Sequence, residues 1–203
     1  MKIICIGRNY RDHAKELNNE VPDEPVIFLK PDSSLLKPGQ VFFLPDLFKE
    51  VHHEVELVVK IGRNGKNIAQ RFAHKYYDEI GLGIDFTARD KQSELKAKGL
   101  PWELAKGFDG SAVVSRMIPK SKLPPVQELT FSLQKNGVTV QSGNTKDMLF
   151  GIDTILAFVS KYFTLKMGDL VYTGTPAGVG PVHREDLLEG FLEGNKVFQC
   201  KVK

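Results

Sequence analysis

The most informative stretch of the sequence reads Glu54-Val55-Glu56-Leu57-Val58-Val59-Lys60-Ile61. Successive side chains of a β-strand point to opposite faces. One face would therefore carry only apolar side chains: Val55, Leu57, Val59 and Ile61. The other face would carry Glu54, Glu56, Val58 and Lys60. We predict a strand with one side facing a core and the other presenting two neighbouring carboxylates.

Elsewhere in the chain, short apolar runs between Pro, Asp and Gly predict further strands. These runs are Ile3–Ile6, Val26–Leu29, Val41–Leu44, Gly81–Thr87, Gly168–Tyr172 and Val197–Val202. A hairpin is expected where Thr130–Gln134 and Val138–Ser142 flank Asn136-Gly137. Helical spacing is confined to three short segments: Tyr10–Leu17, Ala88–Lys98 and Ile152–Val159. Strands outnumber helices without regular alternation, which favours an α+β, mainly β fold over a doubly wound parallel sheet.

The composition suits one compact domain spanning residues 1–203. The chain is 41% hydrophobic, and its net charge of +3 comes from 28 basic and 25 acidic residues without a long run of one sign. We therefore expect no nucleic-acid partner and no membrane partner. No stretch approaches the roughly 18 apolar residues of a membrane span, so a cytoplasmic location is expected. Cys5 and Cys200 are expected to be reduced and buried.

Glu54 and Glu56 are close enough to raise each other's pKa unless a cation lies between them. Oxygen ligands favour a hard ion such as Mg²⁺, Mn²⁺ or Ca²⁺. The alternative is a solvated face of an edge strand. Asp85 lies in the apolar stretch Leu82–Phe86, where an unpaired charge would be costly. Its partner could be the same metal, or it could be Arg89 or Lys106 in a structural ion pair.

Two histidines precede the glutamates and raise the possibility of zinc. Of these, only His52 has the spacing to share the carboxylate face; His53 does not. Zinc is therefore the less favoured metal.

His13 and Glu16 lie three residues apart on a short predicted helix and can reach each other. A carboxylate that orients an imidazole makes a competent base for activating water. An ordinary surface pair is the alternative. Residues 7–10 look like a loop that could move, so residues 1–20 include a candidate mobile lid helix. Lys106 could bind a carboxylate or stabilise an oxyanion.

Several segments, in this order, resemble the fumarylacetoacetate hydrolase family, in its short single-domain branch. The matching segments are Gly7–Glu16, Phe28–Pro31, His52–Leu57, Asp85–Asp90, Gly99–Trp102, Ala105–Asp109 and Thr173–Gly180. Each alone is a weak signal, but the ordered set covers nearly the whole chain. One departure is the stretch His183–Asp186, which stands where the family often has a Gly-Asp pair.

The resemblance implies a mixed β-sandwich roll with short peripheral helices, and a homodimer. It implies Mg²⁺ or Mn²⁺ held by three carboxylates, and it gives catalytic roles to a His–Glu pair and a lysine. Substrate contacts are implied at four further positions. The metal ligands would be Glu54, Glu56 and Asp85; the catalytic residues His13, Glu16 and Lys106; and the substrate-binding residues Arg8, Lys30, Gln92 and Thr175.

The resemblance also implies chemistry on a small anionic keto acid through a metal-stabilised enolate. Because the His13–Glu16 pair suits water activation, Mg²⁺-dependent hydrolysis of a C–C bond in an acylpyruvate, such as fumarylpyruvate or acetylpyruvate, is the leading expectation. Alternatives on the same scaffold are an oxaloacetate decarboxylase or tautomerase and a 5-carboxymethyl-2-hydroxymuconate-type isomerase. A non-catalytic metal-binding dimer is the remote alternative.

Overall fold

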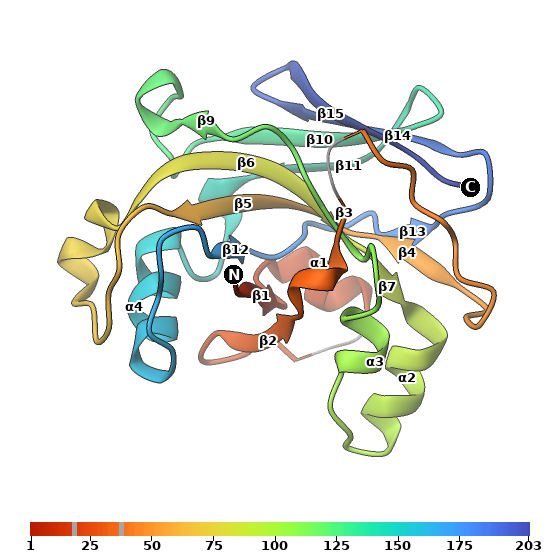
Figure 1. Cartoon of the computed structure of the whole chain (residues 1–203), viewed down its shortest axis with the longest axis horizontal. Coiled ribbons are helices and arrows are strands. Elements are labelled where there is room, and N and C mark those ends of the chain that lie inside the picture. The colour runs from red at the N-terminus through yellow and green to blue at the C-terminus, as the bar shows by residue number, and fades with distance from the viewer. Residues whose placement is uncertain (18–19, 37–38) are drawn as a thin grey trace.

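A curved mixed sheet forms the centre of the molecule (Figure 1). The computed structural model describes residues 1–17, 20–36 and 39–203. Along the sheet the strands lie in the order β2 (Val26–Lys30), β1 (Ile3–Gly7), β12 (Leu170–Tyr172), β5 (Val55–Ile61), β6 (Tyr77–Asp85), β8 (Ala112–Val114) and β3 (Leu35–Leu36), with β9 (Ile118–Pro119) paired to β6. The β1–β12 and β3–β8 pairs are parallel, and the other pairs are antiparallel.

A second, antiparallel sheet lies along the upper side of the first one in Figure 1. Its order is β11 (Val138–Asn144), β10 (Thr130–Lys135), β14 (Leu187–Leu192) and β15 (Asn195–Lys201). A small third sheet joins β13 (Gly180–Pro181), β4 (Val51–His53) and β7 (Thr87–Ala88).

The helices are short. The α-helices are α1 (Arg11–Glu16), α2 (Arg89–Ala97), α3 (Glu103–Lys106) and α4 (Ile152–Tyr162). Helix α4 lies at the left of Figure 1 and α2 and α3 at its lower right, whereas α1 lies nearer the middle of the view. The 3₁₀ turns are η1 (Asp32–Ser34), η2 (Gln70–Lys75), η3 (Lys120–Lys122) and η4 (Thr145–Asp147). The predicted fold class, α+β and mainly β with a sandwich roll and peripheral helices, is confirmed.

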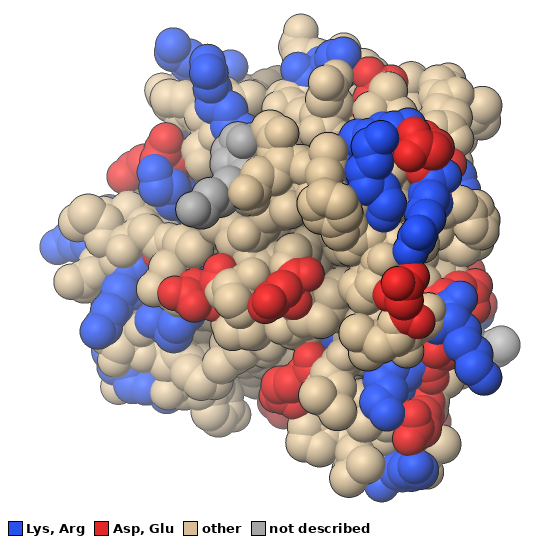
Figure 2. Space-filling model, turned by 45° about the vertical axis from the view of Figure 1, so that its right-hand side comes forward, with Lys and Arg blue, Asp and Glu red and all other residues tan. Residues whose placement is uncertain are grey.

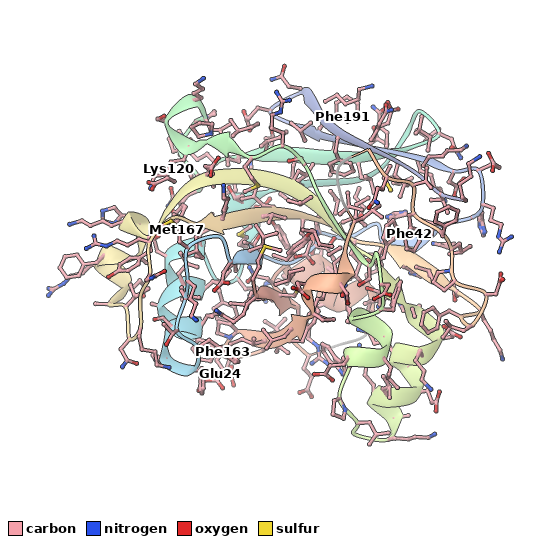
Figure 3. The ribbon with its side chains drawn as sticks, in the orientation of Figure 1. Glu24, Phe42, Lys120, Phe163, Met167 and Phe191 are labelled. Carbon is pink, nitrogen blue, oxygen red and sulfur yellow. The ribbon has the colours of Figure 1, made fainter. Side chains whose placement is uncertain are left out.

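Strand β5 lies between β12 and β6, so both of its edges are paired, and its side chains from Val55 to Val59 are buried on both faces. One face delivers its four apolar side chains to the main core. Phe42, labelled in Figure 3, also joins this core. Its ring stacks on that of Phe86 with 3.9 Å between ring centroids. On the other face, Val58 packs in a smaller cluster with Cys5 and Tyr172. The alternative of a solvated edge strand is wrong, and Glu54 and Glu56 are buried inside the fold.

The predicted hairpin is present as β10 and β11. Asn136 and Gly137 have φ angles of 53° and 79°. Two consecutive left-handed residues are what the tight turn between twisted strands requires. The sequence signal works here because it is local: two adjacent residues determine the turn.

One strand prediction was wrong, and several strands were not predicted. Residues 41–44 form no strand; Phe42 makes only an isolated bridge to Val202. The strands that were not predicted are β14 and the short strands β3, β4, β8, β9 and β13. Strand β14 begins directly after the departing stretch His183–Asp186. Alternating Leu188 and Leu192 are buried there, with Gly190 between them. Gly190 lies beneath the ring of Phe198 on the neighbouring strand. A Cβ at position 190 would lie 2.1 Å from a carbon of this ring, so only glycine fits.

Both cysteines are buried and free, as predicted. Among the helices in the described part of the chain, none combines the length and apolar character that crossing a bilayer requires. The face shown in Figure 2 carries Lys and Arg interspersed with Asp and Glu. This distribution agrees with the absence of long like-charge runs in the sequence.

Candidate active site

Three carboxylates converge where β5 and β6 lie side by side. Glu54 precedes β5, Glu56 lies within it and Asp85 ends β6. Their exposed fractions are 5%, 2% and 0%, and one oxygen from each lies within 4.8 Å of the others. Such a cluster can be tolerated in a protein interior only with compensating positive charge.

Lys106, at the end of α3, supplies part of that charge. Its ammonium lies 2.8 Å from Glu54 Oε2, 2.6 Å from Asp85 Oδ2 and 2.6 Å from Thr87 Oγ1. Burial alone would lower the pKa of Lys106, but the carboxylates of Asp85 and Glu54 outweigh burial and raise it. Lys106 is therefore a permanent cation at neutral pH.

Lys30 and Arg89 complete the compensation. The Lys30 ammonium lies 2.7 Å from Asp85 Oδ1, and Arg89 donates to Glu54 Oε1 at 2.5 Å. Burial raises the pKa of Glu54, but Lys106 and Arg89 more than reverse this effect and hold it well below its usual range. Of the two ion-pair partners considered for Asp85, Lys106 pairs with it, whereas Arg89 pairs with Glu54.

Glu56 is the least compensated of the three. One oxygen, Oε2, accepts a hydrogen bond from the Gly174 backbone N–H at 2.7 Å. Burial, Asp85 and Glu54 together raise the pKa of Glu56 well above its usual range. Gly174 has a φ of 99°, and a Cβ there would lie 2.6 Å from Asn9 Cβ, so glycine is required for this approach.

The three carboxylates fit a hard divalent cation. All the ligand atoms that converge here are oxygens, as Mg²⁺, Mn²⁺ and Ca²⁺ prefer. A cation between them would also remove the repulsion that raises the pKa of Glu56. Within the described residues the cluster includes no histidine. His52 instead contacts Glu50 at 2.7 Å, and its Nδ1 accepts a bond from Arg89, so the geometry gives zinc no support.

His13 and Glu16 form the predicted pair. His13 Nδ1 lies 3.2 Å from Glu16 Oε2, and Glu16 Oε1 accepts a bond from Gly178 N. With Nδ1–H donating to the carboxylate, His13 Nε2 carries a free electron pair. Burial lowers the pKa of His13 below 6.5, so the imidazole is neutral at pH 7 and can accept a proton.

One pocket joins most of the predicted residues. His13, the three carboxylates and Lys106 line it together with predicted substrate contacts: Arg8, Gln92 and Thr175. Its cavity volume is about 30 Å³. A buried water takes roughly 10–15 Å³ on that measure, so the pocket is narrow.

Two predicted residues lie outside the lining of this pocket. Glu16 contacts His13, which itself lines the pocket. Lys30 is 2% exposed and bonds, behind the pocket, to the carbonyls of Phe86, Lys106 and Ser111 in addition to Asp85. Its geometry suits positioning of Asp85 and Lys106.

Thr175 and Gln92 line the pocket with their polar groups already engaged. The Thr175 hydroxyl donates to the Val55 carbonyl at 2.8 Å and accepts from Gln141 at 2.8 Å. Gln92 accepts from Arg89 at 2.6 Å. Contact of either residue with substrate stays a prediction.

Several contributors to this pocket were not predicted as site residues, three of which carry the interactions described here. Lys96 and Trp102 line its wall, and Gly174 anchors Glu56. The one available signal was the spacing of Arg89, Gln92 and Lys96 at i, i+3 and i+7 on α2, which puts all three on one helix face.

The sequence matches the family described as fumarylacetoacetate (FAA) hydrolase C-terminal over residues 2–202. The chain belongs to this family. Membership makes the protein an enzyme of hydrolase, isomerase or decarboxylase type and agrees with the curved sheets and the pocket.

Relatives in the fumarylacetoacetate hydrolase family carry different activities in their names. A Mus musculus protein, "Oxaloacetate tautomerase FAHD1, mitochondrial", is 45% identical over 99% of this chain and 91% of its own. "Oxaloacetate tautomerase YcgM" of Escherichia coli is 42% identical over 97% of this chain and 90% of its own. The crystal structure of fumarylpyruvate hydrolase from Pseudomonas aeruginosa, in complex with Mn²⁺ and pyruvate, has a TM-score of 0.94 at 32% identity, covering 100% and 89% of the chains.

Proposed function

We propose that the protein is an oxaloacetate tautomerase, which interconverts the keto and enol forms of this four-carbon keto dicarboxylate. The observation that carries the proposal is the pocket itself, where three buried carboxylates face a neutral, carboxylate-oriented imidazole. The two relatives named oxaloacetate tautomerase support this choice over hydrolysis, which led on sequence grounds.

Glu54, Glu56 and Asp85 would hold the divalent cation, Mg²⁺ or Mn²⁺. When bound, the cation supplies positive charge that stabilises developing negative charge on the keto oxygen. Lys106 lies against two of the same carboxylates and stays charged, so it adds a second positive charge at this end of the pocket.

Tautomerisation moves one proton between C3 and the oxygen on C2 of oxaloacetate. In the enol-to-keto direction, His13 Nε2 would take the proton from the enol hydroxyl, and the imidazolium so formed would deliver that proton to C3, which returns His13 to its neutral form. Glu16 keeps the Nδ1 proton in place and stabilises the imidazolium that forms. No water attacks and no C–C bond breaks, so the same pair serves without a hydrolytic step.

Hydrolysis of an acylpyruvate is the second candidate. It is favoured by the His13–Glu16 geometry, which also suits water activation, and by the fold shared with the fumarylpyruvate hydrolase structure. The enolate chemistry at the carboxylates is common to both reactions, which differ in whether a water reaches the distal carbonyl.

The test is a substrate panel with Mg²⁺ or Mn²⁺, followed by ultraviolet absorbance: enol oxaloacetate, acetylpyruvate and fumarylpyruvate. We expect the highest kcat/KM with oxaloacetate enol. His13→Ala should lower this value by roughly 10²- to 10⁴-fold, the usual contribution of a general base. His74→Ala, at an exposed histidine, is the matched control and should leave the rate unchanged. A higher kcat/KM on an acylpyruvate would reject the proposal in favour of hydrolysis.

A further inference from the structure

The pocket wall formed by α2 carries more positive charge than the carboxylates neutralise. The described lining residues include four cations, Arg8, Arg89, Lys96 and Lys106, against three carboxylates. Arg89 and Lys106 are committed to Glu54 and Asp85. Within the described chain, Arg8 and Lys96 form no ion pair.

Arg8 is held in place by its backbone. Its φ of 58° is left-handed, which is uncommon for a residue with a side chain and is often found at functional sites. The next residue, Asn9, fixes this turn: it is fully buried and donates to the carbonyls of Phe150 and Thr173. Arg8 Nε is buried and has no hydrogen-bond partner in the part of the chain that the structure describes.

Lys96 approaches the same region from α2. It follows Arg89 and Gln92 on the pocket-facing side of the helix, whereas Glu94 and Lys98 are exposed on the other side. Seven residues of helix separate Lys96 from Arg89 by about 10 Å along the axis. Lys96 is therefore displaced from the carboxylate end of the pocket, and its ammonium lies 5.4 Å from the centroid of the Trp102 ring.

Electrostatics supports the proximity of the two cations. Burial lowers the pKa of Lys96 to about 8, and Arg8 contributes more to this lowering than any other charge, followed by Arg89 and Lys106; Glu54 opposes it. Like charges held together in a pocket are costly unless an anion joins them. The protein therefore presents two converging cations with no anion of its own between them.

We propose that Arg8 and Lys96 bind the distal carboxylate of the substrate and so select dicarboxylates over monocarboxylates. The inference rests on the proposed function, because it specifies which class of keto acid the site accepts. The keto-acid end lies at Glu54, Glu56 and Asp85, and the second carboxylate lies against Arg8 and Lys96. An acylpyruvate with an uncharged acyl end, such as acetylpyruvate, leaves the two cations unpaired.

The test measures binding, so that it is independent of turnover. Calorimetric titration of the Mg²⁺-loaded protein compares malate with lactate, which share the hydroxy-acid end and differ in the distal carboxylate. Wild-type protein should bind malate more tightly. Lys96→Met should weaken the binding of malate by roughly 10- to 100-fold, as expected for a lost charged hydrogen bond. It should change the affinity for lactate little.

Two variants serve as controls. Lys96→Arg keeps the charge and should retain most of the preference for malate. Lys98→Met removes an exposed lysine two positions away, whose partner is Glu94, and should change neither affinity. Equal weakening of malate and lactate by Lys96→Met, or no weakening, would overturn the proposal.

Wild-type protein provides a check that needs no variant. The charged groups that face Lys96 are Arg8, Arg89, Lys106 and Glu54; the pKa of Lys106 is raised, while that of Lys96 is about 8. The preference for malate should therefore decline as the pH rises through 8, and a constant preference to pH 10 would contradict the proposal. If malate binds selectively while oxaloacetate is not turned over, the proposed function fails and the subsite stands.

Discussion

Glu54 and Glu56 show how far a local pattern reaches at the scale of single residues. Alternation along a strand is enough to predict that their carboxylates leave the same face. The cations that pair with the three carboxylates come from positions 21 to 55 residues away along the chain, as in the pairs of Asp85 with Lys106 and of Asp85 with Lys30. No periodicity connects such positions, so the ion-pair arrangement could not be derived from spacing.

Replacement of Glu56 should change stability and metal binding in opposite directions. Glu56→Gln should raise the Tm of the chelated protein, because it removes a buried charge repelled by Asp85 and Glu54. The pKa of Glu56 is higher in the folded protein than in the unfolded chain. The stability that protonated Glu56 contributes is therefore present at low pH and is lost as the pH rises through the folded-state pKa. Gln keeps this side chain neutral at every pH. The same change should weaken Mn²⁺ binding.

Calorimetry in chelator and a Mn²⁺ titration measure the two effects of Glu56→Gln. Glu79→Gln, in a partly exposed pair with Lys60 on the same sheet, is the control and should change neither strongly. Unchanged Mn²⁺ affinity in Glu56→Gln would show that this carboxylate is no ligand.

His13 determines the acid side of the pH profile. Burial lowers its pKa below 6.5, so the neutral base is present at pH 7. The tautomerisation rate should stay level near neutrality and fall only as the pH drops below 6.5. Steady-state rates between pH 5 and 8 at constant ionic strength would show this, and a fall beginning above pH 7 would contradict it.

At the scale of elements, most of the predicted strands and all three predicted helices are present in the structure. Their signals in the sequence are local, which is why they could be predicted. The failures share one feature: they depend on contacts between segments distant in sequence. Residues 41–44 bury Phe42 in the core and hydrogen-bond to residues 201–203, but this pairing is a single isolated bridge and forms no ladder. Strand β14 instead depends on Gly190 fitting under Phe198, a contact between strands that alternation does not reveal.

The α1 helix is the candidate lid, and its tether is Glu16. Residues 18–19 of the predicted lid segment lie outside the described residues. The turn before the helix was expected to be a loop that could move, but the buried hydrogen bonds of Asn9 anchor it. Glu16 joins α1 to the 173–180 loop through Gly178 N. Movement of α1 stays a prediction that depends on this bond.

Glu16→Ala should loosen α1. Loss of the bonds to His13 and Gly178 should speed amide hydrogen exchange in residues 11–17, measured by mass spectrometry. Asp12→Ala, an exposed acid on the same helix, is the control and should leave exchange nearly unchanged. Equal exchange in wild type and Glu16→Ala would show that other contacts hold the helix.

At the scale of the whole molecule, the sequence predicts the class of fold better than the path of the chain. The predicted strand begins at Glu54, yet Glu54 itself lies between β4 in the small sheet and β5 in the central one. The change of sheet places Glu54 at the pocket. The predicted homodimer and its surface stay predictions.

Lys30 connects parts of the molecule that are distant in sequence. From β2 it reaches Asp85 at the end of β6, the Lys106 carbonyl at the end of α3 and Ser111 before β8. Lys30→Met leaves the buried carboxylate of Asp85 with one cation fewer and should lower the free energy of unfolding by about 3–5 kcal/mol. Urea denaturation measures this cost. Lys60→Met, which breaks a half-exposed pair with Glu79, is the control and should lower the free energy of unfolding by under about 1 kcal/mol. Similar losses in the two variants would contradict the central role of Lys30.

The central claim is that Glu54, Glu56 and Asp85 hold the ion on which oxaloacetate tautomerisation depends. The most direct measurement is the initial rate of enol oxaloacetate decay in chelated wild-type protein as Mn²⁺ is added back, beside Glu56→Gln and a protein-free control. We predict a rate at the protein-free level in chelator, recovery that saturates with one Mn²⁺ per chain, and no recovery in Glu56→Gln at the same Mn²⁺ concentrations. Full activity of the chelated wild type, or full recovery in Glu56→Gln, would contradict the claim.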